Sequence, residues 1–321
     1  MPPRKTSACY RFLSRGICKI SPFFLLLLSL AACSTTNRRL PLPKPPANGA
    51  TAPTPLPSAA SHQLTPQEAA FWDALAQANV IYISEVHSDN SHHEYQFDVM
   101  RGLRSRDLRF ATGWEMFEVP QQELLDQWQT GALSTDALLE RVEWQKHWGV
   151  FSQLYEKMLR WAREEQVPVI ALNAPSALSS KVAHGQALDA SERTLIPAGF
   201  HLIPGGFEHF AEQMAQNPHA GVAGSARLQN FYRAQTLWEQ TMASRVVEYL
   251  RNHPGGRLVV LIGRGHVEGG YGVPAYVRQK MNVKQLVLYP GESNSSGDGG
   301  RLAREAKPNL LMAHLTAAPR R

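Results

Sequence analysis

Three short polar stretches stand directly behind apolar runs and carry side chains suited to acid–base chemistry. They contain Glu85 with His87, then Glu115, then Arg264 with His266. A carboxylate beside an imidazole can activate water, and such groups can also bind a divalent metal. A nearby guanidinium can stabilise an oxyanion. Taken together these residues favour a site, although each one alone is equally consistent with a hydrogen-bonded polar group of the core.

Five apolar runs must position these residues, and each predicts a strand. The runs cover Val80–Ser84, Arg109–Trp114, Val167–Leu172, Leu258–Ile262 and Gln285–Tyr289. Apolar strands separated by helices predict an α/β fold with a mostly parallel central sheet flanked by helices. The carboxyl ends of such strands meet at one rim, which would collect six polar residues: Glu85, His87, Glu115, Asn173, Arg264 and His266.

Helix signals fill the segments between the strands. A Thr-Pro start predicts a helix over Pro66–Gln77, and the capping box Ser91–Glu94 predicts one that runs to about Leu103. Two longer segments, at about 119–160 and 175–235, lack strand signals. We expect them to be helical insertions that form a smaller cap subdomain over the edge of the sheet.

The amino terminus has the features of an export signal. A basic leader precedes Pro22–Leu30, an apolar run too short to cross a bilayer as a mature helix. Leu30-Ala31-Ala32-Cys33 resembles a bacterial lipobox, so we predict a signal peptide over residues 1–32 and lipidation of Cys33. The serine that follows resembles an outer-membrane address in Gram-negative lipoproteins.

Composition divides the remaining chain into three parts. Residues 33–62 hold the lipidated cysteine and a proline-rich tether, 63–290 form the folded domain, and 291–321 are predicted to be disordered. The formal net charge of +6 misleads, because removal of the five bases of the leader leaves 28 basic against 27 acidic residues. A nearly neutral mature chain argues against binding of nucleic acid.

Cysteine usage and missing motifs exclude further classes. Cys9 and Cys18 leave with the leader, so the mature chain keeps one cysteine and forms no internal disulfide. The sequence has no Gly-x-Ser-x-Gly elbow, which argues against serine acyl transfer. Gly263-Arg264-Gly265-His266 lacks the lysine of a P-loop and the spacing of a dinucleotide-binding motif.

Several motifs follow one another in a distinctive order between Pro66 and Pro290. They are Ser84-Glu85-Val86-His87 with His92-His93, Glu115-Met116-Phe117, Ala234-Gln235 with Trp238, Met242 and Ala243, and Gly263–His266 leading into Tyr271–Pro274. This order resembles the ChaN family of haem-binding lipoproteins of iron uptake, part of the Tiki superfamily. The superfamily usually has glycine where this chain has Ser84, and serine restricts the backbone there.

The resemblance implies a dimeric haem carrier whose iron is held by a tyrosine, with a histidine or lysine near the propionates. Phenolate is a hard, anionic ligand that suits ferric haem. Tyr232 is the first choice, because it shares a helical stripe with Gln235, Glu239 and Met242. A stripe of this kind is also typical of a hydrogen-bonded core layer, and Tyr155 and Tyr271 are the alternative ligands.

His93 and Trp148 complete the expected haem-binding residues. Trp148 belongs to an aromatic run, 144–151, that could cover a porphyrin or simply form the core of the cap. His201 and His209, which flank a Pro-Gly-Gly turn, are predicted to be surface loop residues.

The function predicted from these features is a non-catalytic, haem-binding outer-membrane lipoprotein of haem and iron uptake. Its expected partners are haem, the membrane through the Cys33 lipid, a second copy of the chain and an outer-membrane haem receptor. The alternative is a hydrolase of the Tiki or erythromycin-esterase type, in which Glu85, His87, Glu115, Arg264 and His266 act with a divalent metal or with histidine alone. A tethered interaction protein with a purely structural rim is a third hypothesis.

Overall fold

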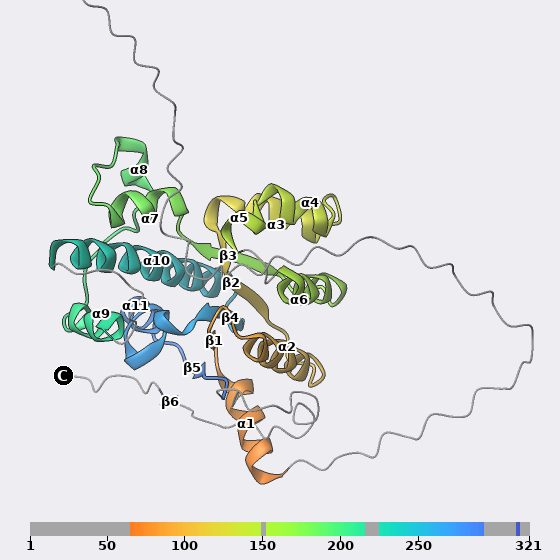
Figure 1. Cartoon of the computed structure of the whole chain (residues 1–321). Helices are drawn as coiled ribbons and strands as arrows, with labels where there is room; N and C mark the ends of the chain where they lie inside the picture. Colours follow the sequence, from red (N-terminus) through yellow and green to blue (C-terminus); the bar gives the residue numbers. More distant parts are fainter. Residues whose placement is uncertain (1–64, 149–151, 216–224, 292–312, 315–321) are drawn as a thin grey trace, which may run out of the picture. The chain divides into compact units, whose positions relative to one another are not determined.

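Six strands form one sheet in the order β3-β2-β4-β1-β5-β6. The computed structural model describes residues 65–148, 152–215, 225–291 and 313–314 (Figure 1). Strands β1 to β5 pair in parallel, whereas β6 pairs antiparallel with β5. Their bounds are β1 Val80–Glu85, β2 Ala111–Glu118, β3 Val169–Asn173, β4 Leu258–Gly263, β5 Gln285–Leu288 and β6 Ala313–His314. The predicted α/β fold with a mostly parallel sheet is confirmed.

Helices cover both faces of this sheet. Figure 1 shows α10 and α11 on one side of the strands and α2 and α6 on the other. The helical elements are α1 Pro66–Gln77, α2 Asn90–Arg104, η1 Val119–Gln121, α3 Gln122–Gln129, α4 Thr135–Arg141, α5 Trp144–His147, α6 Ser152–Glu164, α7 Ser176–Ala183, α8 Ala190–Thr194, α9 Gly206–Ala215, α10 Ser225–Asn252, η3 Arg264–His266, η4 Glu268–Gly270 and α11 Val273–Lys280. Among the described residues, none of these helices is long and apolar enough to cross a membrane.

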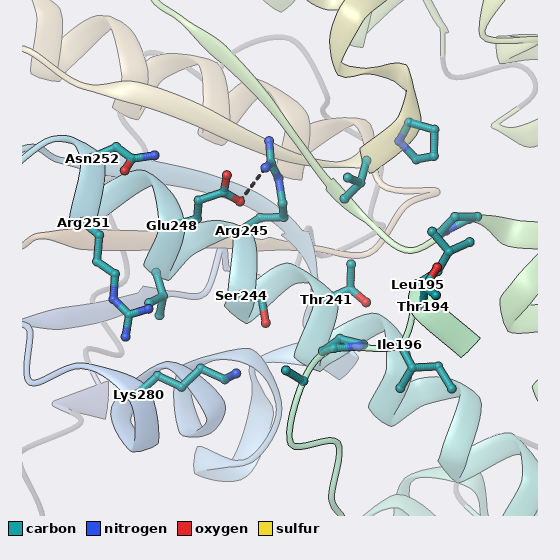
Figure 2. Close-up of a pocket in the computed structure, with 16 residues that line it drawn as sticks. Thr194, Leu195, Ile196, Thr241, Ser244, Arg245, Glu248, Arg251, Asn252 and Lys280 are labelled. Carbon is teal, nitrogen blue, oxygen red and sulfur yellow. Dashed lines mark hydrogen bonds and ion pairs between the residues drawn. The ribbon is translucent and has the colours of Figure 1, made fainter. Parts of the chain in front are cut away.

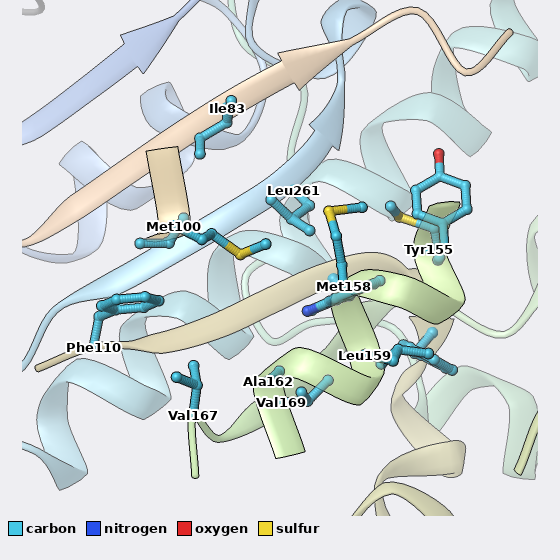
Figure 3. Close-up of a cluster of buried hydrophobic side chains, with 14 of the residues drawn as sticks. Ile83, Met100, Phe110, Tyr155, Met158, Leu159, Ala162, Val167, Val169 and Leu261 are labelled. Carbon is cyan, nitrogen blue, oxygen red and sulfur yellow. The ribbon is translucent and has the colours of Figure 1, made fainter. Parts of the chain in front are cut away.

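The alternation of side chains along β1 builds two cores. Ile81 and Ile83 face the cluster that includes Met100 of α2 and Met158 of α6. Figure 3 shows α6 carrying its apolar side chains across the strands in this cluster. Tyr82 faces the opposite cluster, which contains residues of α10 and α11. Burial on both faces explains why the strands are continuous apolar runs.

The two segments predicted to be helical insertions are helical in the parts that the structure describes. The first of them does not stand apart from the sheet. Its large side chains Trp128, Trp144 and Tyr155 are almost fully buried in the same apolar cluster as Ile81 and Ile83. The cap and that face of the sheet therefore share one core.

Two local predictions need correction. The N-cap of α2 is Asp89, whose carboxylate accepts from the Ser91 backbone, so the predicted start at Ser91 is wrong. Both residue types are good caps, and Asp89 lies where the chain turns out of β1. Strand β2 runs on to Glu118, so Glu115 lies within a strand rather than after one.

Several predicted segments lie outside the described residues. They are the signal peptide, the Cys33 lipidation site, the tether and most of the tail. The predicted disordered tail nevertheless contains β6, which pairs with Leu286 and Val287.

Side chains take the place of a neighbouring strand along the outer edge of β3. The amide of Gln122 accepts from Ala171 N at 2.8 Å and donates to Val169 O at 3.1 Å. The amide of Gln129 accepts from Val169 N at 3.2 Å, and Arg245 Nε donates to Ala171 O at 3.2 Å. The backbone groups of this edge are thus satisfied without another strand.

Candidate functional site

Glu85 is the centre of a buried polar cluster at the end of β1. Its side chain is fully buried, with His87 Nδ1 2.6 Å from Oε1 and His93 Nδ1 3.3 Å from Oε2. Gln96 Nε2 donates to Oε2 at 2.7 Å, and the Tyr155 hydroxyl donates to Oε1. Burial alone would raise the pKa of Glu85, but the hydrogen bonds from His87 and His93 outweigh it and hold the pKa well below its usual range.

Glu115 of β2 carries the cluster on to the second histidine motif. Its Oε1 lies 3.3 Å from His266 Nε2 and 3.9 Å from His87 Nε2. The backbone N–H of Gly263 donates to its other oxygen. Burial acts to raise the pKa of Glu115, and the charge of His266 and its hydrogen bond lower it further than burial raises it. Two neighbouring strands therefore join their acid–histidine pairs into one network.

Helix α10 closes the network behind His266. Glu239 Oε1 lies 3.5 Å from His266 Nδ1, and Gln235 Nε2 lies 2.9 Å from the same nitrogen and donates to Glu239 at 3.0 Å. Burial acts to lower the pKa of His266, but the charges of Glu115 and Glu239 and their hydrogen bonds raise it to about 10. His266 is therefore a buried cation between two carboxylates.

His87 is the most exposed member of this network. Its side chain is 42% exposed, whereas that of Glu85 is inaccessible to solvent. The ring of Trp148 meets it edge-on, with 5.1 Å between centroids. Burial acts to lower the pKa of His87, and the hydrogen bond with Glu85 and the charge of Glu115 raise it above its ordinary value. A ligand can thus reach an imidazole whose charge the buried carboxylates support.

A glycine at the end of β4 permits this close packing. A Cβ atom at Gly263 would lie 3.0 Å from His87 Nε2 and 3.3 Å from a Glu115 oxygen. The corresponding Ser84 of β1 is tolerated, because its hydroxyl points to β5 and donates to Leu288 O at 3.0 Å. The departure from the superfamily pattern therefore leaves the surroundings of His87 unchanged.

The structure brings four of the six predicted rim residues together: Glu85, His87, Glu115 and His266. Asn173 instead accepts from the backbone of Ala174 at the end of β3. Arg264 lies with its guanidinium carbon 5.6 Å from the centroid of the Tyr289 ring, on the β5 side of the rim.

The three candidate tyrosines divide between two places. Tyr155 is fully buried and bonded to Glu85. Tyr232 and Tyr271 line a different, narrow pocket, which we call the tyrosine pocket; Gln235 and Glu239 also line it. Burial and the charge of Glu85 raise the pKa of Tyr155 well above its usual value, and burial raises that of Tyr232. Neither environment favours a free phenolate.

His209 of α9 also lines the tyrosine pocket, although the sequence predicted a surface loop. It stacks on Tyr271 with 4.7 Å between ring centroids, and its Nε2 is buried with no hydrogen-bond partner among the described residues. A Cβ atom at Gly269 would come within 2.6 Å of this ring. Residues 209, 269 and 271 meet only in the folded chain, so no local sequence signal marked His209.

Gln96 was likewise missed, although a signal for it existed. It follows His93 by three residues on α2, so both side chains lie on the face that meets Glu85.

The fold and this network define an α/β protein with paired acid–histidine groups at the carboxyl ends of its central strands. The chain belongs to the family described as haem-binding uptake, Tiki superfamily, ChaN, which it matches over residues 71–277. No protein with a curated description matches the sequence significantly.

Solved structures with a related fold include three of note. ChaN of Campylobacter jejuni, described as binding haem cofacially, is 16% identical with a TM-score of 0.57, over 70% of this chain and 86% of that one. A mutant of the erythromycin esterase EreC in its open conformation is 13% identical with a TM-score of 0.44, over 71% of this chain and 73% of that one. A succinoglycan biosynthesis protein is 13% identical with a TM-score of 0.42, over 74% and 71% of the two chains. The similarity to ChaN supports the predicted α/β fold.

Proposed function

We propose that this protein binds haem through the tyrosine pocket and serves haem and iron uptake. Membership of a haem-binding family carries the proposal. The described residues supply suitable donors, since a tyrosine hydroxyl can ligate ferric iron and a histidine can pair with a propionate. Tyr271 and His209 are both half-buried at this pocket, and the buried His209 Nε2 still needs a partner.

The tyrosine pocket suits haem by its chemistry but not by its present size. Its free volume is about 20 Å³, enough for about one water molecule. The hydroxyl of Tyr232 lies against Gly206, where an added Cβ would approach to 2.2 Å, and that of Tyr271 lies against Gly205. Haem can therefore reach Tyr232 only if the start of α9 moves, whereas Tyr271 is the more accessible ligand. Tyr155 is disfavoured because Glu85 occupies its hydroxyl.

Titration of the purified protein with haemin tests this proposal. We expect a shifted Soret band with the high-spin pattern of tyrosinate ligation in the wild type. Tyr271→Phe or Tyr232→Phe should abolish that pattern, according to which of them ligates iron. Tyr155→Phe is the matched control and should keep the spectrum. An unchanged haemin spectrum with the wild-type protein would refute haem binding, and loss of the pattern in Tyr155→Phe alone would move the ligand to the buried network.

The export features support a location at the outer membrane, anchored by a lipid on Cys33. We expect labelled palmitate to enter the wild-type protein in bacterial cells and the Cys33→Ser variant to remain unlabelled and soluble. Equal labelling of the two forms would rule out this anchor. A homodimer and a haem receptor as partner complete the proposal.

A second candidate function is hydrolysis at the buried network. The observation that favours it is His87, which is open to solvent while Glu85 and Glu115 lie behind it. In this reading His87 exchanges a proton with water or with a leaving group, and the charge of His266 stabilises a developing anion. We expect His87→Ala to reduce turnover of a susceptible ester at least ~100-fold. His184→Ala, an exposed histidine on another helix, should leave it unchanged. A wild-type protein that hydrolyses no member of an ester and peptide panel, with or without added divalent metal, would exclude this function.

A further inference from the structure

A second cavity lies away from the tyrosine pocket, along the carboxyl half of α10. It has a volume of about 490 Å³, within the usual range for small-molecule sites. Helix α10 forms one wall, the end of α11 contributes Lys280, and the segment 194–198 after α8 forms the opposite wall. Figure 2 shows Arg251 and Lys280 on one side of this space and Thr194, Leu195 and Ile196 on the other.

The charged end of this cavity carries an excess of positive charge. Arg245 and Glu248 neutralise each other, with 2.6 Å between Arg245 Nη1 and a Glu248 oxygen. Arg245 also donates to Ala171 O of β3, which fixes it in place. Arg251 and Lys280 form no ion pair within the described residues, and both line the cavity. Two cations thus remain for an anionic ligand.

The opposite end is apolar. Leu195 is 48% exposed, one of few large apolar side chains so exposed in the described chain. Ile196 and Pro197 follow it, and Val119 and Pro120 of η1 line the same space. Solvent exposure of such a surface is unfavourable, and a ligand that covered it would gain the free energy of apolar burial.

From this arrangement we propose that the cavity binds a single-chain amphipathic anion, with its carboxylate or phosphate head between Arg251 and Lys280 and its apolar body against Leu195 and Ile196. The described lining holds no histidine, tyrosine, methionine or cysteine. Haem would therefore lack the usual axial ligands here, and this site is independent of the proposed haem site. Fatty acids and lysophospholipids share the required chemistry.

Basic residues at helix ends have a simpler explanation, because Arg251 and Lys280 lie in the last turns of α10 and α11, where they stabilise the helix dipoles. That role needs no ligand and no apolar wall. The two explanations differ in what removal of the charges does to binding of an anion compared with a neutral molecule of the same chain length.

Calorimetric titration of the purified full chain with decanoate, decyl phosphate and decanol tests the proposal. We expect both anions to bind and decanol to bind at least about tenfold more weakly. Arg251→Ala/Lys280→Ala should weaken decanoate at least about tenfold, and Leu195→Ser should weaken both anions. The matched control is Arg101→Ala/Lys146→Ala, which removes two exposed cations elsewhere and should change nothing.

Relative affinities of decanoate and decyl phosphate would identify a fatty acid or a lysophospholipid as the better ligand. Equal decanoate affinity in the wild type and in Arg251→Ala/Lys280→Ala would overturn the proposal, as would the absence of binding by either anion. Equal affinity for decanol and decanoate would also overturn it, since the cations would then have no role. Thermal melting of each variant separates weak binding from misfolding, because the three altered side chains lie at the cavity surface.

Discussion

Replacement of Glu85 by alanine should lower the free energy of unfolding by about 3–5 kcal/mol. The carboxylate is buried and is contacted by four polar groups, from His87, His93, Gln96 and Tyr155. Removing it leaves these groups without their acceptor inside the protein, where unsatisfied donors are costly. For a domain of this size the loss corresponds to a fall in melting temperature of roughly 6–20 °C.

Chemical denaturation of matched variants measures this effect. Glu85→Gln retains the shape and part of the acceptor capacity, so we expect an intermediate loss of stability. Glu143→Ala is the control, since that side chain is 57% exposed and its pairs lie at the surface, and it should change stability by no more than ~0.5 kcal/mol. A Glu85→Ala protein that unfolds at the wild-type denaturant concentration would mean that the network contributes nothing to stability.

The unfolding free energy should fall by a few kcal/mol between about pH 6.5 and pH 10, and His266 should cause much of the fall. Its pKa is raised from 6.5 to about 10 in the folded protein by Glu115 and Glu239, against the effect of burial. A folded-state pKa above the unfolded one means that the folded chain holds the proton more tightly. The stabilisation is therefore complete below pH 6.5 and is lost as the pH rises through 10.

Denaturation curves measured across this range with the wild type and His266→Gln provide the test. The variant should be less stable near neutral pH and should show a shallower decline, with the residual slope due to His87 and His93, whose pKa values are also raised. His184→Gln changes an exposed histidine and should reproduce the wild-type slope. Parallel curves for the wild type and His266→Gln would show that His266 does not hold its proton in this way. On the acid side the sign is reversed, because Glu85 and Glu115 have lowered pKa values and their stabilisation is lost as the pH falls.

The elements that carry the site were predictable because their signals are local. The apolar runs of β1 and β4 identified two strands, and their parallel pairing places Glu85 beside Gly263. Side-chain alternation then directs His87 and Glu85 to one side, where the structure shows them in contact. In contrast, the boundary of β2 was wrong, because Glu115 and Met116 look like the start of a loop until tertiary packing buries them.

Contacts between distant segments were beyond the sequence. Tyr155 and Glu85 are 70 residues apart, and their hydrogen bond depends on how α6 packs over the sheet. The helical stripe of Tyr232, Gln235 and Glu239 was visible, but not that its polar members would serve His266. The cavity beside α10 has no sequence motif, since its lining comes from segments that meet only through the fold.

The side chains along the edge of β3 limit how this protein can assemble. An exposed edge strand is a template for pairing with another chain and a common starting point for aggregation. Here Gln122, Gln129 and Arg245 occupy one edge of the sheet, and β6 covers part of β5 at the other. Two copies cannot extend the sheet across β3 unless these side chains first withdraw. A homodimer would therefore have to form through helices or loops.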